Sequence, residues 1–305
     1  VANYLLDKNV GDGRYTYSNL PSATNPLETE TISNCPSIGN TRDVHQYGVD
    51  YVRITCPGEH TLNFEGSVQV DLLPVDPHSG EYGFWSNKGD ESDMTLTRRF
   101  DFRDHSGPLT FNYWTWYDLE DNFDYVYLLA SQDGETWQIL TTPSGTPDDP
   151  TGRSYGWAYN GESIGNDSGT GQTGWVHESI DISHLAGKQV YLRFEYLTDA
   201  AVNGEGFLLD DIAIPQTGYI ADFEQDDGGW TGEGFVRIQN HLPQTFRLAV
   251  IRRGGTTSVD HYTLDGDNAL IIPLEIGGDV EEVVLVISGT TRFTRQKAAY
   301  RFSIE

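Results

Sequence analysis

The sequence has little positive charge, little sulfur and little helical periodicity. Of its 305 residues, 19 are Lys or Arg and 46 are Asp or Glu, so the formal net charge is −27. A chain this acidic lacks the basic face that a nucleic-acid-binding protein needs, and an anionic membrane surface repels it. No apolar run approaches the about 18 residues that span a bilayer, so we expect no nucleic-acid partner and no membrane insertion. The first residues have neither a basic nor an apolar segment, and they predict no signal peptide.

Short bursts of aromatic and β-branched residues between turn-forming residues dominate the chain. There are 33 Gly and 13 Pro, and aromatic residues make up 12% of the sequence. This pattern is typical of sandwiches and barrels, and it predicts an all-β protein. Residues 283–287 are continuously apolar, which suits a strand buried on both faces. The predicted strands are 49–54, 61–64, 68–73, 109–116, 125–130, 190–196, 207–214, 245–251, 269–274, 282–288 and 298–304.

Two breaks rich in Pro, Gly and acidic residues divide the chain, at 74–93 and 215–234. Aromatic residues concentrate between the breaks, and aliphatic residues dominate both flanks. Each flank is short for a complete sandwich. We therefore predict that residues 1–80 and 219–305 together form one β-sandwich, into which a jelly roll of residues 81–218 is inserted. Three small domains in a row are the alternative.

The only cysteines, Cys35 and Cys56, are 21 positions apart. They predict a disulfide and hence an oxidising, extracellular or cell-surface location. Closing a loop of this length would contribute about 3 kcal/mol in the chain-entropy model. Two unrelated buried thiols are the alternative.

No motif in the sequence predicts a catalytic centre. Residues 161–165 match G-x-S-x-G around Ser163, but no buried strand precedes Ser163 and no helix follows it. Residues 169–174 match G-x-G-x-x-G, but a strand-like segment follows where a dinucleotide site needs a helix. The metallopeptidase motif H-E-x-x-H is absent. We therefore expect no catalytic residue in this chain.

Acidic clusters beside the predicted strands indicate sites for a hard cation. Ca²⁺ gathers six to eight oxygen ligands, and it would tie strand ends together in a structural role. In a chain this acidic, solvated surface carboxylates are the alternative. The predicted ligands are Asp90, Asp93, Asp121, Asp124, Asp210 and Asp211.

Asp210 and Asp211 lie inside the apolar run 207–214. Strict alternation would place Asp210 on one face with Leu208 and Ile212, where an uncompensated carboxylate is costly. Calcium would offset this cost. Alternatively, both carboxylates reach water or cap turn amides at a strand end.

Aromatic residues of the middle segment could form a flat platform for a carbohydrate ligand. The candidate residues are Trp114, Trp116, Tyr117 and Trp157. The alternative is that alternate members of this group fill the core of the sandwich.

Several sequence blocks resemble the immune inhibitor A family of secreted bacterial metallopeptidases. These blocks are residues 85–98, 114–120, 124–127, 198–212, 234–237 and 242–244. The resemblance implies the region that follows that family's zinc catalytic domain, with a MAM-like jelly roll, calcium-binding strand ends and an Ig-like sandwich. Because H-E-x-x-H is missing, proteolytic activity does not carry over.

The resemblance favours a non-catalytic, calcium-stabilised extracellular accessory or adhesion region. Its partners would be its own catalytic domain, or a protein or glycan of the cell surface or matrix. A stand-alone self-assembling fibre, coat or adhesin subunit is one alternative. A carbohydrate-binding module is the other.

Overall fold

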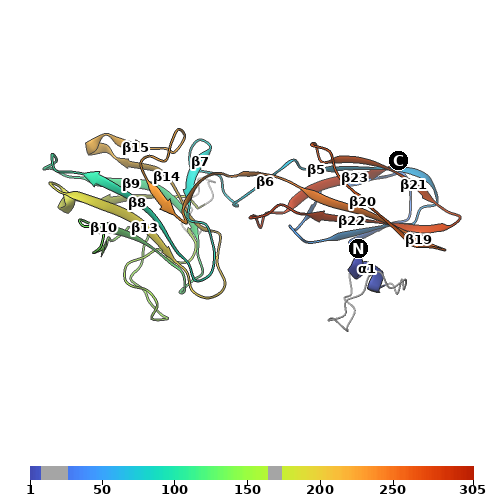
Figure 1. Ribbon diagram of the computed structural model, residues 1–305, viewed down its shortest axis with the longest axis horizontal. Helices are drawn as coiled ribbons and strands as arrows, with labels where there is room; N and C mark the ends of the chain where they lie inside the picture. Colours follow the sequence, from blue (N-terminus) through green and yellow to red (C-terminus); the bar gives the residue numbers. More distant parts are fainter. Residues whose placement is uncertain (8–26, 164–173) are drawn as a thin grey trace. The chain divides into compact units, whose positions relative to one another are not determined.

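The computed structural model describes residues 1–7, 27–163 and 174–305, which form two separate units (Figure 1). The flank unit comprises Val1–Pro74 and His241–Glu305, and the middle unit comprises Val75–Asn240. Both are β-sandwiches, as the composition predicts. No helix in the described part of the chain is long and apolar enough to cross a bilayer.

The flank unit packs two five-stranded sheets around an aliphatic core. The first sheet has the order β1 (Glu30–Ile32), β4 (Asp50–Ile54), β22 (Val280–Gly289), β19 (Phe246–Gly254) and β20 (Ser258–Tyr262). The second has the order β2 (Ser37–Ile38), β23 (Ala298–Ile304), β5 (Gly58–Gly66) and β21 (Ala269–Ile276), and β3 (Arg42–Val44) pairs with β23. Strands β6 (Gln69–Asp71) and β18 (His241–Pro243) form a separate two-stranded sheet.

Strand β22 is buried on both faces, as its apolar run predicts. All residues from Val283 to Ile287 are buried, and Val286 is the most exposed of them at 6%. One face of the strand lies in the sandwich core. Helix α1 (Ala2–Asp7) lies beside this sheet (Figure 1). Its Tyr4 and Leu5 cover the other face, where they pack with residues of β4, β19 and β22.

The predicted disulfide between Cys35 and Cys56 is present in the flank unit. The two Cα atoms are 5.9 Å apart, within the range that a disulfide requires.

The middle unit is the aromatic-rich sandwich. One sheet has the order β11 (Gln138–Ile139), β10 (Tyr125–Ser131), β13 (Gln189–Leu197), β8 (Asp93–Asp101) and β16 (Thr231–Glu233). The other has the order β12 (Val176–Asp181), β9 (Thr110–Asp118), β14 (Gly206–Ile214), β7 (Tyr82–Trp85) and β17 (Val236–Gln239), and β15 (Tyr219–Ala221) pairs with β14. Short 3₁₀ turns occupy Ser183–Leu185 and Pro215–Thr217.

The structure moves the second predicted boundary from residue 218 to residue 240. Residues 219–240 belong to the middle unit because β15, β16 and β17 pair with β14, β8 and β7. The break in composition at 215–234 therefore consists of connections within one sandwich, and it does not separate two domains.

Candidate metal centre

Three carboxylates meet where β10 begins and β13 ends. Glu120 and Asp124 lie in the turn before β10, and Asp199 lies just after β13. These strands are antiparallel neighbours in which Tyr125 is paired with Leu197, so the turn before β10 faces the segment after β13. One ligand oxygen from each carboxylate lies within 4.8 Å of those from the other two. We call Glu120, Asp124 and Asp199 the carboxylate cluster.

Asp124 is the buried member of the carboxylate cluster, with no exposed surface. Its Oδ1 accepts a hydrogen bond from the backbone N–H of Asp199 at 3.0 Å, and its Oδ2 accepts one from the Tyr196 hydroxyl at 3.1 Å. Burial raises the pKa of Asp124 to about 6, and the charges of Glu120 and Asp199 add to this rise. The side chain is thus fixed in place while its negative charge is poorly compensated.

Glu120 contributes an oxygen without a partner. Its Oε2 is buried and has no hydrogen bond to any described residue. Desolvation raises the pKa of Glu120, and the neighbouring charge of Asp199 raises it further. Arg153 is the compensating cation of the cluster, and its Nη1 lies 2.8 Å from Asp199 Oδ2. Three carboxylates and one arginine leave negative charge and a free oxygen, an arrangement that suits a hard cation such as Ca²⁺.

Of the six aspartates predicted as metal ligands, the structure places Asp124 alone in the carboxylate cluster. Asp90 is exposed, and its Oδ1 accepts a hydrogen bond from Asn203 Nδ2 at 2.7 Å, while its charge adds to the rise in the pKa of Glu120. Asp93 and Asp121 are exposed and lie outside the cluster. The six predicted ligands do not include Glu120 and Asp199, the other two members of the carboxylate cluster, although both flank predicted strands.

Asp210 and Asp211 form a different feature, a β-bulge in β14. The pairing of β14 with β9 shifts register between Asp210 and Ala213, and Asp211 adopts φ 48°. Asp210 Oδ2 accepts a hydrogen bond from the backbone N–H of Ser79 at 3.0 Å. Asp211 Oδ2 lies 2.8 Å from His78 Nδ1, and its Oδ1 accepts a hydrogen bond from the Ser79 hydroxyl at 2.9 Å. Protein groups therefore satisfy both carboxylates.

The bulge overturns the predicted alternation of side chains along β14. Phe207 and Leu209 face the core before the bulge, and Ile212 and Ile214 face it afterwards. The extra residue shifts the periodicity by one, so that neither aspartate shares the core face with these side chains. Asp210 thus accepts hydrogen bonds from two backbone N–H groups, those of Ser79 and Asp211, and calcium binding at this position stays a prediction.

The predicted aromatic platform is dispersed. Tyr117 belongs to the core, and Trp116 is only 2% exposed. Trp157 donates a hydrogen bond from Nε1 to the Thr142 carbonyl at 2.9 Å. Trp114 stacks on the His78 ring with centroids 3.8 Å apart. The four side chains do not form a common exposed surface.

Ser163 forms hydrogen bonds with the backbone of Tyr117 in β9. Its hydroxyl donates to the Tyr117 carbonyl at 3.2 Å and accepts from the Tyr117 N–H at 3.0 Å, and the residue is fully buried. Most of the G-x-G-x-x-G match, residues 169–173, lies outside the described residues.

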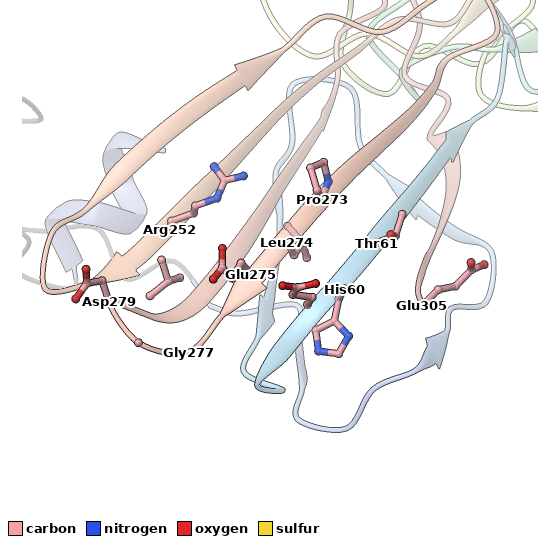
Figure 2. Close-up of a pocket in the computed structure, with 12 residues that line it drawn as sticks. His60, Thr61, Arg252, Pro273, Leu274, Glu275, Gly277, Asp279 and Glu305 are labelled. Carbon is pink, nitrogen blue, oxygen red and sulfur yellow. The ribbon is translucent and has the colours of Figure 1, made fainter.

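The flank unit has a hollow of about 850 Å³ beside the turn between β21 and β22. Figure 2 shows Asp279 and Arg252 toward one end of it and Glu305 toward the other. Arg252 already pairs with Asp260. The acidic side chains are spread around the rim, and they do not converge as the carboxylate cluster does.

Comparisons with known proteins match the whole middle unit together with residues 49–74 of the flank unit. Residues 49–240 match the family described as immune inhibitor A-like, MAM domain. The pre-pro-metalloprotease PrtV of Vibrio cholerae is 28% identical over 174 residues, which cover 55% of this chain and 17% of that protein. Immune inhibitor A of Bacillus thuringiensis is 27% identical over 175 residues, which cover 55% of this chain and 23% of that protein. The chain thus matches about a fifth of the length of these relatives.

Proposed function

The chain belongs to the immune inhibitor A-like MAM domain family, and from this we propose that it is a non-catalytic extracellular accessory region that Ca²⁺ stabilises and that attaches to a surface or substrate. The match over residues 49–240 carries the accessory role, because it covers a non-catalytic domain of metalloproteases. The disulfide between Cys35 and Cys56 supports an oxidising, extracellular location.

The carboxylate cluster supports the proposed calcium site. Glu120, Asp124 and Asp199 supply hard oxygen ligands, and the buried Oε2 of Glu120 has no partner within the described residues. A bound Ca²⁺ would offset the repulsion between the three charges, and it would join the start of β10 to the end of β13. Its role would therefore be to stabilise this end of the sandwich.

Thermal unfolding of the complete chain tests the calcium site. We expect added CaCl₂ to raise the Tm above its value in EGTA, because Ca²⁺ binds the folded state. The Glu120→Gln and Asp199→Asn variants should lose most of this increase. Asp121→Asn is the matched control, since Asp121 is exposed and adjacent to Glu120 but outside the cluster. Equal melting of the wild type in CaCl₂ and EGTA would contradict the calcium site.

The accessory role is tested by measuring retention and hydrolysis together. The purified chain is applied to surfaces coated with gelatin or with immobilised glycans, and peptide release from denatured casein is followed in parallel. We expect retention on a coated surface without hydrolysis. Casein hydrolysis by the homogeneous chain would overturn the non-catalytic assignment, and failure of retention on every surface would overturn attachment.

A further inference from the structure

The charged residues that line one hollow of the middle unit are mostly basic, although the unit as a whole is strongly acidic. Residues 75–240 contain 8 Lys or Arg and 29 Asp or Glu, a balance of −21. Three of the eight basic residues, Arg98, Arg99 and Arg193, line a single hollow of about 520 Å³. Glu233 is the acidic residue among the residues lining it. We call this place the arginine hollow.

The arginine hollow lies along the outer face of β8, β13 and β16. Thr97 is paired with Arg193 of β13 on one side and with Thr231 of β16 on the other. Arg99 is paired with Tyr191 in the next row on the same face. Side chains two positions apart on a strand share a face, so the hollow gathers guanidinium and hydroxyl groups on one surface.

Arg98 reaches the hollow from the opposite side of β8, and it has no counter-ion among the residues that the structure describes. Its guanidinium lies 4.1 Å from the centroid of the Tyr219 ring and 4.8 Å from that of Phe100. Its Nε is buried without a hydrogen-bond partner, and the side chain forms no ion pair with a described residue. Gly229 leaves room for the guanidinium, since a Cβ there would lie 2.0 Å from Nη1. A partly buried, unpaired cation indicates a place for an anion.

The other two arginines are held in position by a threonine hydroxyl, a glutamine amide and an aromatic ring, and Arg193 also pairs with Glu195. Arg193 Nε donates to Thr97 Oγ1 at 2.9 Å, and its guanidinium lies 4.0 Å from the Trp137 ring centroid. Its Nη1 also lies 3.3 Å from Glu195 Oε2. Arg99 Nη2 donates to Gln189 Oε1 at 2.6 Å. Because a guanidinium has five N–H donors, both side chains retain donors for a ligand.

We propose that the arginine hollow binds the carboxylate or sulfate group of an acidic glycan. The inference rests on the proposed accessory role and deepens it by naming a class of attachment ligand. The fixed guanidinium groups suit bidentate recognition of an oxyanion. The hydroxyls of Thr95, Thr97 and Thr231 suit the neutral hydroxyl groups of the sugar.

The backbone around the hollow favours a glycan over an acidic peptide. Between Thr95 and Thr97, β8 is paired with β13 on one side and with β16 on the other. A peptide strand would need free backbone groups at an edge. The adjacent edge strand β16 is only three residues long. A ligand in the hollow would therefore be recognised by side chains and not by backbone hydrogen bonds.

Affinity electrophoresis of the complete chain tests this proposal with four polymers. Polygalacturonate carries carboxylates, carrageenan carries sulfates, dextran is neutral, and polyglutamate is an acidic peptide. We expect polygalacturonate or carrageenan to retard the wild-type chain, and we expect dextran to leave it unretarded. Retardation by neither acidic glycan would overturn the proposal, as would equal retardation by polyglutamate at matched charge or by dextran.

Variants assign any retardation to the arginine hollow. We expect Arg98→Gln and Arg99→Gln each to weaken glycan binding at least tenfold. Thr231→Glu adds a negative charge at an exposed position, so it should weaken binding without loss of folding. Arg103→Gln is the control, because Arg103 is exposed, pairs with Asp101 and does not line the hollow. Unchanged binding in Arg99→Gln and Thr231→Glu would overturn the assignment even if Arg98→Gln failed to fold. Calcium-dependent melting and lack of hydrolysis are measured separately, so failure here is distinguishable from failure of the accessory role.

Discussion

Asp124 accepts a hydrogen bond at 3.0 Å from the backbone N–H of Asp199, although the two residues are 75 positions apart in the chain. Pairing of β10 with β13 creates this contact, and the contact brings two carboxylates together at the end of the sheet. The same pairing therefore explains both the poor charge compensation of the cluster and its suitability for a cation.

The effect of Glu120→Gln on stability should differ between calcium-free and calcium-containing buffer. In EGTA it removes a negative charge beside Asp199, so we expect stability to be unchanged or to rise by up to about 1 kcal/mol. In CaCl₂ it removes a ligand, so the variant should be less stable than the wild type. Urea unfolding in both buffers measures the two differences. Destabilisation by the same amount in both buffers would indicate a packing role instead.

The free energy of unfolding of the Asp210→Asn variant, relative to that of the wild type, should increase as the pH rises. Burial raises the pKa of Asp210 to about 7, and the charges of Asp211 and Glu224 contribute to the rise. The folded state therefore holds this proton more tightly than the unfolded state, so the stabilising contribution is complete below about pH 4 and is lost as the pH rises through 7.

Asn cannot ionise, although it accepts only one of the two N–H bonds that Asp210 accepts. Between pH 4 and pH 8 we expect the free energy of unfolding of Asp210→Asn, relative to the wild type, to increase by more than about 1 kcal/mol. Urea unfolding at several pH values measures this change, with the exposed Asp121→Asn as control. A difference independent of pH would show that folding does not raise the pKa of Asp210.

Replacing both cysteines by serine should destabilise the flank unit. The disulfide closes a loop between positions 21 residues apart, and its loss removes about 3 kcal/mol from the free energy of unfolding. Urea unfolding of Cys35→Ser/Cys56→Ser beside the wild type measures the loss. Equal stability of the two proteins would contradict a net stabilising role for the disulfide.

Truncation of Leu5 should show that α1 is part of the flank unit. Leu5 is 1% exposed against the outer face of β4, β19 and β22, so Leu5→Ala should cost about 2–4 kcal/mol. Leu27→Ala is the matched control, because Leu27 is 86% exposed. Thermal or urea unfolding distinguishes the two variants, and an equally small effect for both would contradict packing of α1 on the sheet.

Several features depend on local chemistry and can be predicted from the sequence alone. Aromatic and β-branched bursts between turn residues specified an all-β protein, because such side chains suit a pleated, half-buried surface. The apolar run from Val283 to Ile287 specified a strand buried on both faces. The single pair of cysteines limited the disulfide to one pairing.

Which side chains contact one another depends on how the strands pair in three dimensions. The register of β10 against β13 selected Glu120 and Asp199 as companions of Asp124, out of many acidic residues that look alike in sequence. One extra residue at Asp210 and Asp211 reversed the faces of β14, and strand pairing moved residues 219–240 into the middle unit. Alternation along a strand is a local property, whereas register, bulges and strand order depend on partners far away in the sequence.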